Sequence, residues 1–217
     1  SSRDINSSVD VVLTSTINDK SIEDAKEVEA RMVTMTMSER LAYTLSLWPV
    51  MLPLSVVFAA EYAMQSGTWA AIGFPVDDKD ARNDFYEYAN WTYQIGVLVS
   101  RSSSSIFAMN LIQIQIIPIF QLFLLAFFII NAYMKLWYDW GLIALCFIVG
   151  LMGGAVYSHG FSYLSEHVEP SLKEFSLSAA SLGDSVGVLV GDLCGIFIQK
   201  AIYDYHNLSD DDDGGRR

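Results

Sequence analysis

Long apolar runs with few charges are the feature that most restricts how this chain can fold. The longest, residues 106–134, contains no Asp, Glu, Lys or Arg. A helix rising about 1.5 Å per residue over such a run would cross the roughly 30 Å hydrocarbon core of a bilayer. Hydrophobic residues make up 52% of the chain, and they follow one another rather than alternate with polar residues. We therefore predict an all-helical, polytopic transmembrane bundle.

The charge and cysteine content exclude several classes of function. A net charge of −12 makes nucleic acid an unsuitable partner, because its phosphates repel an acidic surface. Much of that charge lies in residues 77–87 and 210–213, which we interpret as solvated flanks. Cys146 and Cys194 each lie inside an apolar run and form neither a disulfide framework nor a metal-ligand spacing. We therefore expect no metal and no other cofactor.

The chain divides into three parts by composition. Residues 1–40 are polar and predict a flexible linker or central loop, with a short amphipathic helix over residues 22–37 as one option. A membrane domain is predicted for residues 41–203 and an acidic, disordered tail for residues 204–217. The chain begins in a polar stretch without an initiator Met, so we expect it to be a fragment, the C-terminal half of a longer protein. The domain should hold five spans, residues 41–64, 85–100, 106–134, 141–158 and 175–202.

Prolines and aromatic residues predict kinks and interfacial positions within these spans. We expect Pro49 and Pro53 to kink the first span, and Pro118 lies near the middle of the third. Residues 65–84 are predicted to form a loop with an interfacial patch at residues 69–75. Aromatic residues are dense in the second span, which is typical of an interfacial belt, with stacking on a substrate as the alternative.

Arg101 follows an apolar stretch and precedes four serines, in the sequence YQIGVLVSRSSSS over residues 93–105. A guanidinium does not lose its proton, so it must reach water, phosphate or a carboxylate. One interpretation is an arginine at a helix end that touches lipid headgroups. The other is a charge that faces a polar cavity and pairs with a carboxylate of another helix. Asp184 is the first candidate for that partner and Glu61 the second.

Other polar side chains within the spans extend the candidate site. The substrate-binding or coupling candidates are Glu61, Arg101, Asp184, Tyr93, Gln94 and Asn110. Asn110, Gln113 and Gln121 are spaced so that they could share one face of the third span. His159, Glu166, His167 and Glu169 follow the fourth span; we favour an ordinary polar loop there over a metal or proton-relay site.

Small residues recur at helical spacing in the last two spans. Gly150 and Gly154 are four residues apart, and a second series repeats every four residues, at Gly183, Gly187, Gly191 and Gly195. Stripes of this kind let two helices approach closely. We predict that both stripes serve helix packing.

Four sequence blocks together resemble one known family. They are AEY at residues 60–62, YQIGVLVSRSS at 93–103, GLMGGAVY at 150–157 and EFSLSAASLGDSVG at 174–187. Their order and spacing are similar to the C-terminal half of the battenin family, the protein family of Batten disease (a neuronal ceroid lipofuscinosis). The resemblance covers roughly residues 41–203.

The resemblance implies a multipass protein of the lysosomal or vacuolar membrane, related to the major facilitator superfamily. It also implies roles in organelle pH homeostasis, in basic amino-acid movement in fungi and in the clearance of glycerophosphodiesters in animals. Two departures matter. The N-terminal half of the family pattern is missing, so half of any translocation path is absent. The sequence also ends in GGRR, without the C-terminal prenylation box of the animal members, so we expect no lipid anchor there. Five spans are in addition one fewer than a six-helix transporter half has.

Two functions therefore compete, and neither is enzymatic. The first is a secondary transporter of a small polar or charged solute, with the bilayer, the N-terminal half of the same protein, the solute and protons as partners. The second is a membrane scaffold or trafficking protein of the endolysosomal system, which would bind partners through its polar loops and tail. No catalytic motif favours an enzyme.

Overall fold

The computed structural model describes residues 35–104 and 106–208, and within these ranges the chain folds into helices without any strand. The result confirms the predicted all-helical class. The α-helices are α2 (Met37–Ser46), α3 (Trp48–Ala63), α4 (Lys79–Ser103), α5 (Leu111–Met134), α6 (Leu142–His167) and α7 (Lys173–His206), and the short pieces are η1 (Met64–Thr68), η2 (Trp69–Ala71) and η3 (Pro170–Leu172). Most of the predicted linker and the acidic end of the predicted tail lie outside the described residues.

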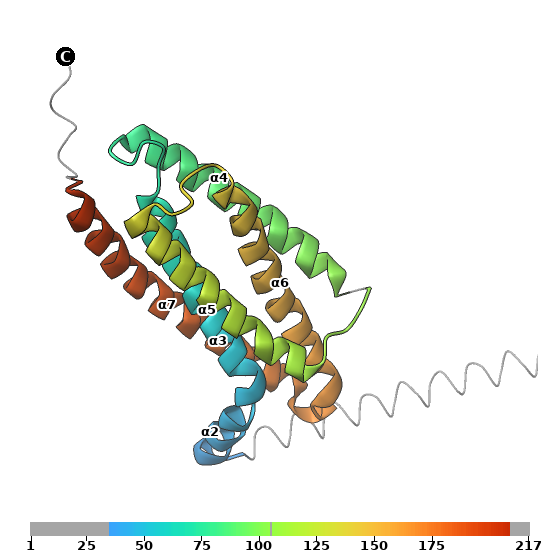
Figure 1. The fold of residues 1–217 in the computed structure, drawn as a ribbon. Coiled ribbons are helices and arrows are strands. Elements are labelled where there is room, and N and C mark those ends of the chain that lie inside the picture. Colours follow the sequence, from blue (N-terminus) through green and yellow to red (C-terminus); the bar gives the residue numbers. More distant parts are fainter. Residues whose placement is uncertain (1–34, 105, 209–217) are drawn as a thin grey trace, which may run out of the picture.

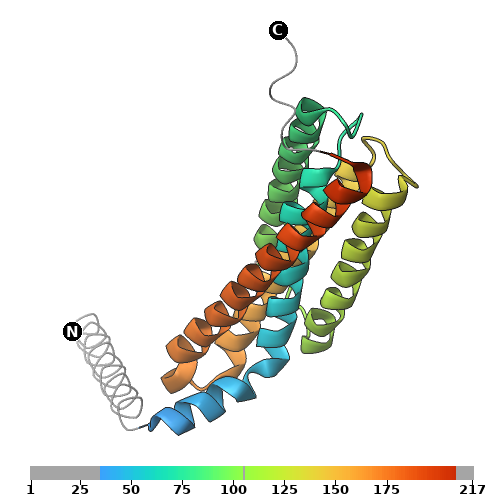
Figure 2. The ribbon, with the colours of Figure 1, turned by 90° about the vertical axis from the view of Figure 1, so that its left-hand side faces the viewer.

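The five long helices form one elongated bundle in which successive helices run in opposite directions (Figure 1). The closest pairings are α4 with α6 and α3 with α7, and α3 also contacts α5 and α6. Helix α3 is therefore the central element. Figure 2 shows α5 on one side of the bundle and α4 on the other, with α7 crossing in front of α3.

The first predicted span is not one helix. A bend of 70° separates α2 from the helical segment that starts at Trp48 and continues through η1 and η2 to Ala71. Pro49 lies in the first turn of α3, where its missing N–H costs no hydrogen bond, so it begins this helix instead of kinking it. The predicted loop over residues 65–84 is correspondingly shorter. Helix α4 already begins at Lys79, because Asp78 caps it by accepting the N–H of Asp80 at 2.9 Å.

The predicted polar loop after the fourth span is also wrong in part. Helix α6 continues to His167, so His159, Glu166 and His167 are helical residues. Only Glu169 lies in the connection before η3. Apolar residues such as Leu164 keep one side of this extension in the core, and that packing maintains the helix beyond the apolar run.

Three helical segments are long and apolar enough to cross a membrane: Leu111–Met134, Leu142–His167 and Pro170–His206. The bent pair of α2 and the segment Trp48–Ala71 makes a fourth if it counts as one span. Helix α4 does not meet the same limit, because charged and polar residues along its length make it too hydrophilic on average. A crossing by α4, and so the full set of five spans, stays a prediction.

Glycines decide how closely the paired helices approach. Gly183, Gly187, Gly191 and Gly195 are all buried on the side of α7 that faces α3 and η1. A Cβ atom added to Gly187 would lie 2.9 Å from the Cα of Ser55, so only a hydrogen atom fits there. On the other side of the bundle, Gly154 of α6 packs on α4, where a Cβ atom would lie 2.8 Å from the carbonyl oxygen of Val97.

The apolar core has two parts, one toward each end of the bundle. One surrounds Trp69, Phe85 and Phe128 near the end of the bundle where α4 begins. The other surrounds Leu54 and Ile114 and lies nearer the start of α3. The residues of α3 between these two clusters include the buried carboxylic acid described next.

Candidate functional site

Glu61 places an ionisable group in the middle of the bundle. Its side chain is fully buried on α3. The hydroxyl of Tyr93 on α4 donates a hydrogen bond of 2.9 Å to Oε2, and the amide of Gln121 on α5 donates one of 3.1 Å to Oε1. Three helices therefore each contribute one polar side chain, and these bonds replace part of the hydration that the carboxyl group loses.

A fourth helix provides the space for this carboxyl group. Gly153 on α6 lies so close that a Cβ atom there would lie 2.6 Å from Oε2 of Glu61 and still nearer to Oε1. The spacing of small residues predicts packing roles for Gly150 and Gly154 but gives none to Gly153 between them. The role of Gly153 depends on the position of a side chain from another helix, which a run of glycines does not reveal.

Further buried polar atoms around this group have no hydrogen-bond partner within the part of the chain that the structure describes. They are Oε1 of Gln121, Nε2 of Gln65 and Nε1 of Trp69. The Trp69 ring packs edge-on against Tyr93, with 5.9 Å between the ring centroids. The set of Glu61, Tyr93 and Gln121 therefore lies beside additional donors and an acceptor, and it has capacity for further hydrogen bonds.

Arg101 does not form the predicted ion pair. The side chain is exposed on α4, and its guanidinium carbon lies 4.3 Å from the ring centroid of Tyr157 on α6. Among the described residues, neither Asp184 nor Glu61 forms an ion pair with it. Helix α4 packs mainly on α6, whereas Asp184 is on α7, whose main partner is α3. A cation over a tyrosine ring gains about 0.5–2 kcal/mol, so the ring takes the place that the sequence assigned to a carboxylate.

Tyr62 lies near several ionisable side chains. It is half-buried on α3, next to Glu61 in the chain, and it lies within range of the charges of Asp184 and Asp192 on α7 and of Arg101 on α4. Asp184 in addition accepts a 3.2 Å hydrogen bond from the hydroxyl of Ser185. The structure thus brings the predicted charges into one region without direct pairing, and it adds Tyr62 and Asp192 to them.

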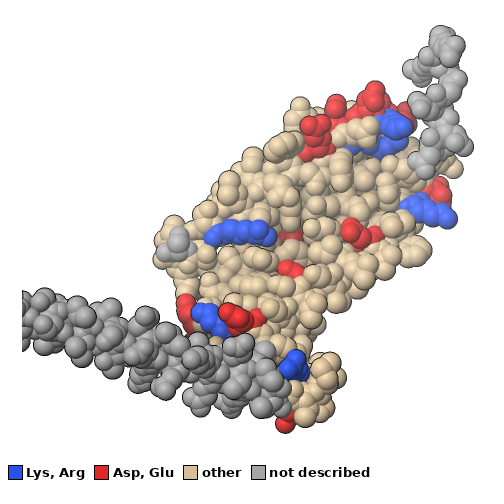
Figure 3. Space-filling model, turned by 180° about the vertical axis from the view of Figure 1, so that it is seen from behind, with Lys and Arg blue, Asp and Glu red and all other residues tan. Residues whose placement is uncertain are grey.

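These charges lie away from the ends of the bundle. Figure 3 shows a face with charged side chains at its ends and, midway between them, a basic side chain and acidic atoms on an otherwise uncharged surface. Within the described residues of α5 there is no charged side chain at all. The charged side chains in the middle of the bundle therefore lie on the side formed by α3, α4 and α7.

The remaining candidates lie in two different places. Gln94 is exposed on α4 two helical turns before Arg101, so both occupy one stripe of that helix. Asn110 precedes α5 and is eleven residues from Gln121, which corresponds to about 16 Å along a helix. The predicted common face of Asn110, Gln113 and Gln121 is wrong. Gln121 is buried, whereas Asn110 and Gln113 are exposed, and the N–H of Asn110 donates to Oε1 of Gln113 at 2.8 Å.

Comparison with known proteins identifies the family. The family model described as CLN3 protein matches residues 2–205. The chain belongs to the CLN3 protein family. Protein BTN1 of Eremothecium gossypii is 28% identical over 194 residues, which are 83% of this chain and 47% of that relative. Protein BTN1 of Candida albicans is 34% identical over 155 residues, or 65% of this chain and 34% of the relative.

The Neurospora crassa protein btn-1 is 33% identical over 151 residues, or 66% of this chain and 31% of the relative. The chain therefore spans less than half the length of these curated relatives. No solved structure shows a significant match to it.

Three of the four sequence blocks that indicate this family meet at the buried carboxyl group. The first provides Glu61, the second Tyr93 and the third Gly153, and they lie on α3, α4 and α6. The fourth block contains Asp184 on α7. In this CLN3-family chain the blocks are thus neighbours in space, although more than 30 residues separate the first from the second.

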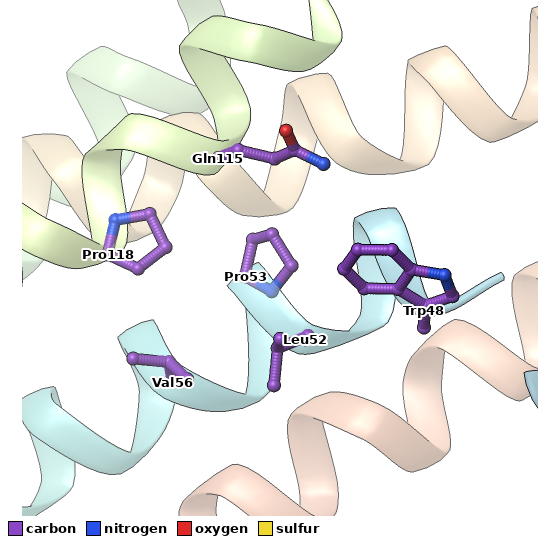
Figure 4. Close-up of a pocket in the computed structure, with 6 residues that line it drawn as sticks. All are labelled: Trp48, Leu52, Pro53, Val56, Gln115 and Pro118. Atoms are coloured by element: carbon purple, nitrogen blue, oxygen red, sulfur yellow. The ribbon is translucent and has the colours of Figure 1, made fainter.

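An apolar cavity of about 230 Å³ lies between α3 and α5, apart from the group around Glu61 (Figure 4). Pro53 and Pro118 face each other across it. Pro53 has no N–H for the carbonyl of Pro49, and the amide of Gln115 donates to that carbonyl at 3.4 Å instead. The amide of Gln115 thus supplies a donor to a carbonyl that the proline leaves without its helical partner. Among the described residues, no group of three His, Cys, Asp or Glu is arranged to hold a metal ion.

Proposed function

We propose that this chain forms one half of the solute pathway of a secondary transporter in the lysosomal or vacuolar membrane. The supporting observation is that Asp184 and Asp192 lie well inside helix α7 and Glu61 is fully buried in the bundle, while Arg101, in the last turn of α4, lies within range of their charges near Tyr62. A charged residue at the centre of a membrane helix costs roughly 3 kcal/mol on insertion scales, so residues retained there commonly line ion or substrate paths. The solute class is a glycerophosphodiester or a basic amino acid, and its movement would contribute to organelle pH homeostasis.

Each charged residue has a proposed role. Arg101, on the same stripe as Gln94, attracts an anionic group of the solute, and Asp184 with Asp192 attracts a cationic one. Glu61 with Tyr93 takes up or releases protons as the coupling ion. No enzymatic step is part of the proposal.

The missing wall of the pathway would come from the N-terminal half of the full-length protein. Transporters of the major facilitator type place the solute between two such halves, which rock against each other within the bilayer. The length of the relatives, more than twice the part that this chain matches, supports a second half.

The first experiment is metabolite profiling of vacuoles or lysosomes isolated from cells that lack the full-length protein. The cells are rescued with wild type, Arg101→Ala or Asp184→Asn, and with Asp204→Asn as a control, because Asp204 is an exposed residue near the end of the same helix. We expect one class of polar solute to accumulate, and to be cleared by wild type and the control but not by the other two variants. Full rescue by both Arg101→Ala and Asp184→Asn would contradict the proposed roles.

A scaffold or trafficking role is the second candidate. It is favoured by the exposed acidic side chains at the start of α4, namely Asp77, Asp78, Asp80, Asp84 and Glu87. Such a cluster suits a basic partner surface and needs no transport. Solute movement by the purified full-length protein in liposomes would reject this candidate as the main function.

A further inference from the structure

A separate cavity of about 440 Å³ opens at the end of the bundle where α5 begins and α6 ends. It is lined by Met109, Asn110 and Leu111 from the start of α5 and by His159, Tyr163 and His167 from the last turns of α6. Its volume is within the range of small-molecule sites. Because Asn110 is about 16 Å along α5 from Gln121, this cavity is distinct from the group around Glu61.

The start of α5 directs free N–H groups to this cavity. The first hydrogen bond of the helix runs from the N–H of Ile114 to the carbonyl of Asn110. The N–H groups of Leu111 and Ile112 precede that bond, both residues line the cavity, and neither N–H has a partner among the described residues. The first-turn N–H groups of a long helix carry partial positive charge and bind anions.

His159 provides an independent observation at the same cavity. Its side chain is only 1% exposed, yet Nδ1 has no hydrogen-bond partner among the described residues. The other ring nitrogen, Nε2, lies 3.5 Å from the hydroxyl oxygen of Ser103, and the ring of Phe107 covers the imidazole with 5.0 Å between centroids. A buried nitrogen without a partner costs free energy, and a ligand in the cavity that His159 lines would remove that cost.

We propose that this cavity binds an oxyanion, a phosphate or carboxylate group, between the first turn of α5 and His159. The N–H groups of Leu111 and Ile112 donate to the ligand oxygens. His159 donates from the opposite wall through Nδ1–H, in the tautomer whose unprotonated Nε2 accepts the hydroxyl of Ser103. His167 cannot turn freely toward the ligand. Its ring stacks on that of Tyr163 with 4.0 Å between the ring centroids, and its Nδ1 lies 3.0 Å from the carbonyl oxygen of Tyr163.

Glu166 is exposed on the wall of this cavity, and its carboxylate weakens the binding of any anion. Because the cavity lies where the membrane-length helices end, the oxyanion can belong to a lipid headgroup or to a free solute.

The test uses the full-length protein purified in detergent. Its thermal unfolding midpoint is measured against inorganic phosphate, with ionic strength kept constant by chloride. The key pair is Leu111→Pro and Leu111→Ala. Both remove the leucine side chain, but only proline removes the N–H, and Asn110 already has the extended conformation that a residue before proline prefers.

We expect phosphate to stabilise wild type and Leu111→Ala, and its apparent affinity to fall at least about tenfold in Leu111→Pro and in His159→Ala. Glu166→Gln should bind phosphate more tightly. If Leu111→Pro does not fold, His159→Ala and Glu166→Gln still test the proposal. It requires the apparent phosphate affinity to fall in His159→Ala and to rise in Glu166→Gln.

A second arm identifies the source of the oxyanion. Each variant is placed in nanodiscs of phosphatidylcholine with or without phosphatidylglycerol. Stabilisation by phosphatidylglycerol alone, lost in His159→Ala, assigns the site to a lipid headgroup. Stabilisation by phosphate with the same variant pattern assigns it to a free solute. The proposal is overturned if neither anion stabilises the protein, or if these variants leave the response unchanged.

Discussion

The hydroxyl of Tyr93 on α4 donates a hydrogen bond of 2.9 Å to the carboxyl group of Glu61 on α3. Tyr93 is only 6% exposed and Glu61 is fully buried, so water does not compete for this contact. The bond links the pair α4–α6 to the pair α3–α7 through a polar group in an apolar core. Mutations around it should therefore affect both stability and any function that depends on Glu61.

The first prediction concerns that bond. Tyr93→Phe keeps the ring but leaves the buried carboxyl group with one donor fewer, which should destabilise the protein by about 1–3 kcal/mol. Tyr88→Phe is the control, because Tyr88 is 58% exposed on the same helix. The thermal unfolding midpoint of the purified full-length protein measures both. Equal midpoints for the two variants would show that the hydrogen bond contributes no stability.

The second prediction concerns the space for Glu61. Gly153→Ala places a Cβ atom within 2.6 Å of the carboxylate, so either the carboxyl group or helix α6 must move, at a cost of about 1–3 kcal/mol or more. Gly160→Ala on the same helix meets its nearest atom, Cγ1 of Val50, at 3.3 Å and should be tolerated far better. Yield of folded protein and unfolding midpoint are the measurements. A stable Gly153→Ala variant with unaltered transport would contradict this packing.

The third prediction separates two glycines of one stripe. Gly187→Ala should loosen the contact of α7 with α3, because its Cβ atom would lie 2.9 Å from the Cα atom of Ser55 and still nearer to the carbonyl oxygen of that residue. Gly183→Ala meets its nearest atoms at 3.4 Å, an ordinary contact, and should be neutral or stabilising by up to about 1 kcal/mol through higher helix propensity. Unfolding midpoints of the two variants test this. The reverse order would mean that the stripe does not set the distance between these helices.

The fourth prediction concerns the aromatic ring of Tyr157, over which the guanidinium of Arg101 lies. Tyr157→Phe retains the ring and should retain transport, whereas Tyr157→Leu removes a contact of about 0.5–2 kcal/mol and should lower the transport rate up to about tenfold. The initial rate of solute uptake by proteoliposomes of the full-length protein measures this effect. Unfolding midpoints provide the control for stability. Equal rates for both variants would exclude the ring as a positioning group for Arg101.

Several features were predictable because they depend on local sequence. The apolar run over residues 106–134 predicts a membrane-length helix, and α5 occupies most of it. The repeat of four residues from Gly183 predicts a stripe on one side of a helix, since positions four apart lie on one face. The four family blocks are likewise short runs of neighbouring residues, and the family that they indicate is confirmed by the match to the CLN3 protein family.

Other features depend on contacts between segments that are distant in the chain. Glu61 and Gln121 are both polar residues in apolar helices, but only the crossing of α3 and α5 makes them hydrogen-bond partners. The ion pair predicted for Arg101 is absent for the same reason, because the helix that packs beside α4 presents an aromatic ring instead of a carboxylate.

The sequence by itself therefore determined that this chain is an all-helical membrane protein with unusual charges in its helices. Hydrophobicity and helical periodicity are properties of consecutive residues, so they can be read without knowing the fold. Only the tertiary structure decided that Glu61 is enclosed by Tyr93, Gln121 and Gly153, while Arg101 rests on Tyr157. Burial and partner choice are set by which helices pack together, because a buried polar group takes the donor that a neighbouring helix places within hydrogen-bond distance.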